Sequence, residues 1–501
     1  MKNASLALLQ TVFSIFSLFY SYKLILQYVG VENLGLWALI VSIASMSRIS
    51  ELGLSGSVLK YVSGYLAKLE NKKAILAVNT STTSVGILVA ITMIVFYLPM
   101  EKVILYILKE DSIYFENQFI LLLALLSSWF AAIAGVSKLS LEGCQRYDYS
   151  TLSAISSTIV FVISVLYLVP TLGITGLAIA SVLQWLVLFL TCRFFLKRSI
   201  NGMPFLSCDF SLNSWKSLVN YGLQFQIISL VKIFLEPLTK GLLGKYGDIT
   251  AVGFYELASK FATQMRRLLV AMNQVLIPKV SEFQAKGVLN VKEIYRKNFK
   301  LVLFISVYFF TGLLCIVPFI ETYWFGQREL QFQLFSIIAV TAFFLNTISI
   351  PAYMMNLGTG KLSNNVVSHA LMGIVNIVLG VILGSLYGAT GVVLSWGLAL
   401  AAGTIPILAP FHRRNQIRLG ELIGKFDILG LVLSILGVVI YWYCYYSIFN
   451  GSTYYVHIGT LTIVLAIFFV IPVWLSPYKS DFLTRISNFL SKNIGSTTNV
   501  K

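Results

Sequence analysis

The chain has 501 residues, of which 57% are hydrophobic, 14% aromatic and only 11% charged, whereas a soluble protein carries about 25% charged residues. This composition excludes a soluble globular protein and places the chain in a membrane. The net charge of +17 does not indicate a nucleic-acid partner, because the Lys and Arg residues concentrate in loops on one side, as cytoplasmic loops do.

Apolar segments follow one another along the whole chain, and each is close to the length of about 20 residues that a helix needs to cross a bilayer. We expect the first segment to be retained, because it lacks the small-residue cleavage site of a signal peptide. The sequence therefore predicts an all-α polytopic membrane protein with about fourteen transmembrane helices. The expected helices are 5–28, 35–58, 75–98, 118–139, 151–170, 173–195, 218–240, 249–277, 299–320, 331–356, 363–386, 389–411, 428–449 and 454–475.

Charged residues inside the first two segments are candidates for a functional site, because charges at bilayer depth are costly and tend to mark transport pathways. Arg48 and Glu51 are spaced i, i+3 in segment 35–58, so they can pair on one face. The alternative is an ion pair that only fixes helix packing. Lys23, near the end of segment 5–28, either faces a cavity or extends its ammonium group towards the membrane surface.

Segment 218–240 places Lys232, Glu236 and Lys240 on one helical face, with Pro237 beside the glutamate. Lys240 is expected at the outer end of this helix. A charged helix that contains proline is tolerated where protein or water satisfies the freed backbone groups. We therefore expect Lys232 and Glu236 of this face to line a cavity.

Segment 249–277 places Glu256, Lys260 and Arg267 along a single stripe. Glu256 and Lys260 are spaced i, i+4, so their side chains can form an ion pair on the helix surface. For Arg267, a solvated face near the cytoplasmic end explains the charge equally well. The predicted site thus has Lys23, Arg48, Lys232, Lys260 and Arg267 as substrate-binding cations, and Glu51, Glu236 and Glu256 as counter-ions or coupling groups.

An internal repeat organises the chain. Gly143 and Gly358 lie 215 positions apart, as do Gly173 and Gly388 in the turns Leu-Gly-Ile-Thr-Gly and Tyr-Gly-Ala-Thr-Gly. Each copy holds an even number of expected helices, so the two should be related by an axis along the membrane normal. The sequence predicts a six-helix lobe (1–196), a cytoplasmic amphipathic connector (197–217), a second six-helix lobe (218–412), an additional helix pair (413–476) and a cytoplasmic tail (477–501).

The positions of the cysteine and histidine residues do not indicate a metal-binding site. The five cysteines and three histidines lack the spacing of metal ligands or of a disulfide framework. We expect no cofactor, no metal site and no catalytic residue.

Several stretches together resemble the bacterial polysaccharide transporter family, the O-antigen flippases of the multidrug/oligosaccharidyl-lipid/polysaccharide exporter superfamily. They are Gly-x-Glu-x-x-Gly-Leu-Trp-Ala-Leu at 30–39, Glu-Leu-Gly-Leu-Ser-Gly-Ser at 51–57, Lys-Tyr-Val-Ser-x-Tyr-Leu-Ala at 60–67, Glu-Gly-Cys-Gln-Arg-Tyr at 142–147 and Gly-Phe-Tyr-Glu-Leu-Ala at 253–258. The resemblance covers residues 1 to about 480. One departure is Glu236, where family members often have aspartate.

The resemblance implies a flippase in the bacterial inner membrane, with both termini cytoplasmic, that moves an undecaprenyl-pyrophosphate-linked oligosaccharide to the outer leaflet. Its partners would be this lipid-linked substrate, membrane lipids and polysaccharide polymerase or assembly proteins. Two alternatives stay open. A multidrug exporter shares the superfamily fold, whereas a membrane glycosyltransferase or polymerase would normally show an acidic pair or a large outer loop, neither of which occurs here.

Overall fold

The computed structural model describes residues 2–51, 53–108, 119–207, 209–274, 280, 291–359, 363–447, 454–470 and 474, with side chains described except at 2–9, 223–232, 271, 272, 274 and 454–458. Most residues in these ranges are helical, and none of them lies in a strand. Eight helices within them are long and apolar enough to cross a membrane. The predicted all-α polytopic class is confirmed, whereas the count of fourteen spans stays a prediction.

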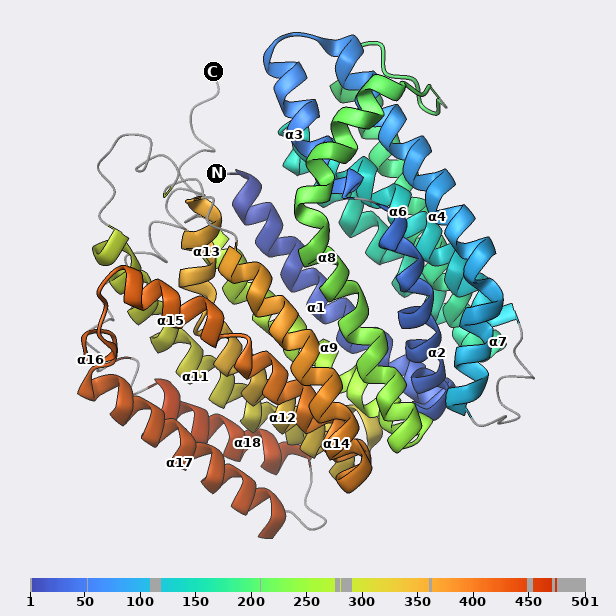
Figure 1. The fold of residues 1–501 in the computed structure, drawn as a ribbon. Coiled ribbons are helices and arrows are strands. Elements are labelled where there is room, and N and C mark those ends of the chain that lie inside the picture. Colours follow the sequence, from blue (N-terminus) through green and yellow to red (C-terminus); the bar gives the residue numbers. More distant parts are fainter. Residues whose placement is uncertain are drawn as a thin grey trace, which may run out of the picture. The chain divides into compact units, whose positions relative to one another are not determined.

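The described chain forms two compact units, of which the first holds residues 2–256 and 379–392. In this unit α6 packs on α7 and on α3, and α4 packs on α8 (Figure 1). Small buried residues such as Ala131, Ala132 and Ala134 of α6 allow this close approach of helices. Its elements are α1 (Lys2–Tyr28), α2 (Gly30–Ser45), the 3-10 helix η1 (Met46–Glu51), α3 (Leu54–Ala67), α4 (Asn71–Leu108), α6 (Phe119–Gly143), α7 (Tyr147–Ser199), α8 (Leu212–Tyr246), the start of α9 (Ile249–Gln274) and part of α14 (Ser363–Ala402).

The second unit holds residues 257–378 and the chain from 393 onward. Besides the rest of α9 and α14, its elements are α11 (Val291–Phe325), α12 (Leu330–Thr347), α13 (Ile350–Gly358), α15 (Ile405–Arg414), α16 (Leu419–Leu422), α17 (Lys425–Ser447), α18 (Tyr454–Leu465) and the π-helix η2 (Ala466–Val470). One core gathers Tyr295, Phe299 and Phe411. A second core joins Cys315 of α11 to Tyr441 of α17 and Phe469 of η2, so the C-terminal helices are bound to α11.

Two glycines with the same unusual backbone support the internal repeat. Gly173 has φ 56° and ψ −131° within α7, and Gly388 has φ 59° and ψ −141° within α14. L side chains rarely adopt a positive φ, so glycine is required at both kinks. A Cβ at Gly176 would lie 2.3 Å from the carbonyl oxygen of Leu168, and one at Gly391 would lie 1.9 Å from that of Leu383. The two turns are therefore built alike, 215 residues apart.

Several predicted helix limits differ from those of the structure. The helix expected to end at 98 continues as α4 to Leu108 and contains Pro99. The helix expected at 35–58 is interrupted, because residues 46–51 form η1 and Gly53 has φ 70°. The helix expected to begin at 218 begins at Leu212, where the Ser211 hydroxyl accepts a hydrogen bond from the Ser214 amide. Such an N-cap satisfies one of the free amides of the first turn.

Candidate functional site

Arg48 and Glu51 form a pair on η1. Arg48 Nε donates to Glu51 Oε1 at 2.5 Å, and the Ser55 hydroxyl donates to Glu51 Oε2 at 2.7 Å. In a 3-10 helix residues i and i+3 lie directly above each other, so the interruption of the α-helix aligns the two side chains. Arg48 keeps 34% of its side chain exposed and Glu51 only 13%. The carboxylate is thus held on both oxygens, while part of the guanidinium stays accessible.

Lys240 is the central cation of a second, more deeply buried cluster. Its side chain is 2% exposed. Its Nζ lies 2.7 Å from Glu236 Oε1, 2.8 Å from Glu256 Oε2 and 3.1 Å from the carbonyl oxygen of Ala38. Of the three donors of a lysine ammonium, Lys240 uses two in hydrogen bonds to Glu236 Oε1 and the Ala38 carbonyl oxygen, and it forms an ion pair with Glu256 Oε2. Removing one partner of such a buried pair generally costs about 3–5 kcal/mol.

Tyr22 completes this cluster from α1. Its hydroxyl donates to Glu256 Oε1 at 3.3 Å, and Glu256 is buried. Glu236 is different, because 48% of its side chain is exposed. The cluster therefore joins a buried carboxylate and an accessible carboxylate through one buried ammonium group.

The structure brings together some of the predicted site residues. Glu236 and Glu256 meet at Lys240, which the sequence alone places at the outer end of its helix and outside the predicted site. The i, i+4 spacing between Glu236 and Lys240 is the sequence signal that could have placed Lys240 in the site. Arg48 pairs with Glu51, separately from this cluster.

The remaining predicted cations differ in their surroundings. Lys23 on α1 and Lys260 on α9 are partly buried. Arg267 is exposed and donates to Gln264 Oε1 at 2.7 Å. The side chain of Lys232 lies outside the described residues.

The turn at 142–147, one of the stretches that carry the family resemblance, forms a network of its own. Arg146 donates from Nε and Nη2 to the Asp148 carboxylate at 3.0 and 2.8 Å, and its guanidinium lies 3.6 Å from the ring centre of Tyr149. Hydrogen bonding to Asp148 raises the pKa of Arg146 above its usual range. The Ser150 hydroxyl donates to Glu142 Oε1 at 2.9 Å. These contacts fix the turn between α6 and α7.

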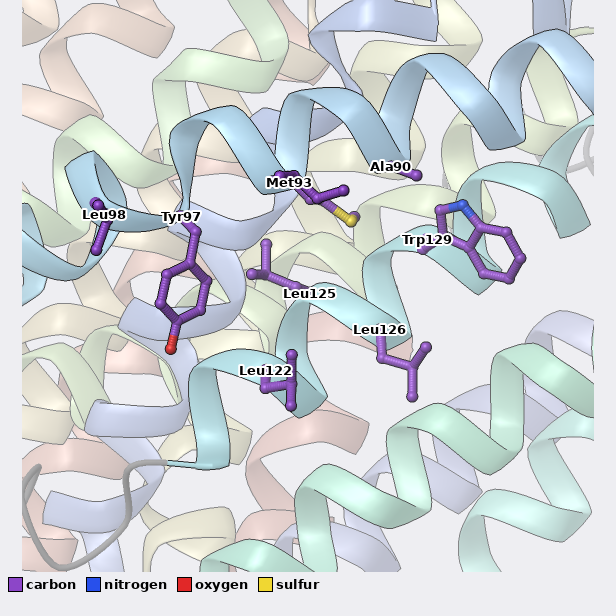
Figure 2. Close-up of a pocket in the computed structure, with 9 residues that line it drawn as sticks. Ala90, Met93, Tyr97, Leu98, Leu122, Leu125, Leu126 and Trp129 are labelled. Atoms are coloured by element: carbon purple, nitrogen blue, oxygen red, sulfur yellow. The ribbon is translucent and has the colours of Figure 1, made fainter.

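An apolar groove lies between α4 and α6 in the first unit (Figure 2). It encloses about 600 Å³, and its lining includes Met93, Tyr97, Leu125 and Trp129. Figure 2 shows these side chains facing the same space from the two helices. A lining of this kind offers contact to hydrocarbon and no charge to an anionic group. Across the described residues, no group of three or more His, Cys, Asp or Glu side chains is placed to hold a metal.

Solved structures with a similar fold are membrane transporters. The lipid II flippase MurJ, in an inward closed conformation, matches with a TM-score of 0.70 and 14% identity over 94% of this chain and 98% of that chain. An inward-facing multidrug resistance MATE family transporter of the MOP superfamily matches with a TM-score of 0.69 and 13% identity, over 81% of this chain and 94% of that chain. A MATE transporter from Vibrio cholerae matches with a TM-score of 0.56 and 15% identity, over 84% of this chain and 99% of that chain.

At these identities the likeness shows a common fold. No curated protein matches the chain. The family model described as polysaccharide biosynthesis protein matches residues 2–284, which is more than half of the 501 residues and contains both charged clusters. This multi-pass membrane protein belongs to the polysaccharide biosynthesis protein family.

Proposed function

We propose that this protein is a flippase, and not an enzyme, that carries an undecaprenyl-pyrophosphate-linked oligosaccharide from the cytoplasmic to the outer leaflet of the bacterial inner membrane. The oligosaccharide would be a repeat unit of O-antigen, capsule or exopolysaccharide. The observation that carries the proposal is a partly accessible guanidinium, Arg48, between apolar helices of a chain from a polysaccharide biosynthesis family. The fold that it shares with a lipid II flippase supports the same function.

The chemistry of the substrate explains why cations are needed. A pyrophosphate cannot cross hydrocarbon unaided, and a guanidinium can bind it through two parallel N–H donors. Arg48 would bind the pyrophosphate, while Lys23, Lys232, Lys260 and Arg267 would supply further positive charge along the path. The polyprenyl tail would stay in lipid.

The carboxylates would hold these cations while the site is empty. Glu51 already accepts from Arg48, so the substrate would compete with it for the guanidinium. Glu236 and Glu256 would serve as counter-ions or proton carriers. Rocking of one six-helix lobe against the other would expose the site alternately to the two sides. Both termini would lie in the cytoplasm, and polysaccharide polymerase or assembly proteins would receive the product.

A multidrug exporter is the second candidate, because a multidrug transporter has nearly the same TM-score. Deleting the protein from its native host separates the two functions. The flippase proposal predicts loss of surface glycan, accumulation of the lipid-linked repeat unit on the cytoplasmic leaflet and unchanged drug susceptibility. Unchanged glycan together with raised susceptibility to cationic drugs would reject the proposal in favour of drug export.

A further inference from the structure

A stripe of basic side chains lies at the start of α11, in the second unit. Lys292, Arg296 and Lys300 are spaced i, i+4 and i+8, so they share one helical face and extend over about 12 Å of the helix axis. The neighbouring face of the same turns carries Tyr295 and Phe299, which are buried in the core. The stripe therefore lies at the edge of the core, and Lys292 and Arg296 keep 41% and 42% of their side chains exposed.

This stripe lines a cavity of about 340 Å³, a volume that can hold a small ligand. The other lining residues are Glu293 and Lys297, whose carboxylate and ammonium groups pair at 3.0 Å. The lining thus carries four cationic side chains and one carboxylate. A cavity with this excess of positive charge suits an anionic ligand.

A second carboxylate faces the stripe from α16. Glu421 Oε2 lies 3.2 Å from Lys292 Nζ and 3.5 Å from Arg296 Nη1. Lys292 also donates to the carbonyl oxygen of Gln416 at 3.0 Å. The hydrogen bond from Lys292 holds the pKa of Glu421 below its usual range, and the charge of Arg296 acts in the same direction. Two cations of the stripe therefore share one carboxylate, which an anion can replace.

Exposed apolar side chains lie beside this carboxylate. Leu419 and Ile423, two residues before and after Glu421, have 62% and 39% of their surfaces exposed. Basic residues flank the segment along the chain at Arg414 and Lys425. Apolar side chains between basic ones are typical of segments that lie in the membrane interface. The same turn thus offers charge to a headgroup and apolar surface to hydrocarbon.

Topology alone also concentrates Lys and Arg in cytoplasmic loops. Lys68 and Lys72, exposed where α3 ends and α4 begins, are cations of this kind. At the start of α11 the cations are instead arranged around a cavity, and two of them share a carboxylate from another helix. Topology does not require that arrangement, whereas a bound anion does.

We propose that the cavity at the start of α11 binds the phosphate of an anionic phospholipid such as phosphatidylglycerol, whose acyl chains lie beside Leu419 and Ile423. The topology expected from the loop charges places this end of α11 at the cytoplasmic leaflet. The phosphate competes with Glu421 for Lys292 and Arg296, and the Arg296 guanidinium offers it two parallel N–H donors. The bound lipid fastens the turn around α16 to α11. This inference goes beyond the proposed function and does not depend on it.

Native mass spectrometry of the purified full chain in neutral detergent tests the proposal, because it resolves individual bound lipids. Phosphatidylglycerol should bind more tightly than phosphatidylethanolamine with the same acyl chains, since the latter headgroup has no net charge. Each basic residue near a membrane surface changes the affinity for an anionic lipid by roughly fivefold. Arg296→Gln combined with Lys300→Gln should therefore weaken the tightest phosphatidylglycerol site by roughly 25-fold.

The matched control is Lys68→Gln combined with Lys72→Gln, which removes the same charge and should leave the affinity unchanged. Glu421→Gln tests the competition, because loss of the carboxylate releases two cations and should tighten phosphatidylglycerol binding severalfold. Glu70→Gln is the control for this change. It alters the charge equally at the start of α4, where Glu70 pairs with Lys73 at 2.9 Å, and should have no effect.

Three results would overturn the site: equal affinities for the two lipids, no weakening in the Arg296→Gln and Lys300→Gln protein, or equal weakening in its control. Glycerol phosphate, the soluble headgroup, should not displace phosphatidylglycerol at equal concentration. Displacement would assign the cavity to a soluble phosphate and reject the lipid. If the Arg296→Gln and Lys300→Gln protein does not fold, Glu421→Gln against Glu70→Gln still decides. Transport plays no part in this measurement, so its failure would leave the flippase proposal standing.

Discussion

Arg48 offers its guanidinium to a substrate while Glu51 holds it at 2.5 Å through Nε alone. Arg48→Lys keeps the charge but loses the planar fork, so transport should fall less than in Arg48→Ala, for which a loss of about tenfold or more is expected. Arg418→Ala, in the turn before α16, is the control and should transport normally. The measurement is the rate of lipid-linked oligosaccharide export. Normal transport by Arg48→Ala would make the pair purely structural.

Glu321 is a fully buried carboxylate at 0% exposure that ties α11 to α12 and α17. It accepts hydrogen bonds from the Glu329 amide, from Gln333 Nε2 at 2.6 Å and from the Tyr445 hydroxyl at 2.9 Å. Glu321→Ala leaves these donors buried without an acceptor and should lower the free energy of unfolding by about 3 kcal/mol.

Thermal unfolding in detergent measures this effect. Glu293→Ala is the control on the same helix, because Glu293 pairs with Lys297 at the surface, where both side chains are more than half exposed, and such pairs contribute little. A Glu321→Ala protein as stable as the Glu293→Ala protein would show that the network does not hold α17 in place.

At the scale of single residues, the sequence predicts contacts between side chains that are close in the chain better than it predicts which distant residues pack around them. The i, i+3 spacing of Arg48 and Glu51 predicts their contact correctly. The sequence places Lys240 at the outer end of its helix and not in the site, because position along a helix does not reveal what packs over it. Its acceptor on Ala38 comes from 202 residues away, and no local pattern encodes that contact.

At the scale of helices, the internal repeat is seen in the equivalent glycine kinks of α7 and α14. Gly173→Ala and Gly388→Ala each force a side chain into a left-handed backbone and should each destabilise the protein by about 1–3 kcal/mol. Gly64→Ala, in α3 with no atom within 4 Å of the added Cβ, should be neutral or slightly stabilising because alanine favours helix. Thermal unfolding of the three variants is the measurement. Unequal responses at 173 and 388 would argue against equivalent turns.

Helix limits show where sequence reasoning at this scale stops. The repeat is visible because its glycines are needed for backbone shape, and the structure places both in the same conformation. The end of α4 is not predicted because Pro99 resembles a helix stop, yet the helix runs on to Leu108. The break at η1 is not predicted because residues 46–51 contain neither glycine nor proline.

For the whole molecule, the loop charges predict that the connection between α11 and α12, which contains Arg328, faces outward and that the C-terminus is cytoplasmic. An enzyme active only outside the cell should be active when inserted beside Arg328 and inactive when fused after Lys501. The opposite pattern would invert the topology.

The central claim is lipid-linked oligosaccharide transport, and reconstitution into vesicles tests it most directly. Purified protein is placed in vesicles with an undecaprenyl-pyrophosphate-linked oligosaccharide, and its exchange between leaflets is followed with and without a proton or sodium gradient. We predict exchange well above that of protein-free vesicles and a marked loss in Arg48→Ala. Exchange no faster than in protein-free vesicles under every gradient, from a protein that moves a cationic drug in the same vesicles, would contradict the account.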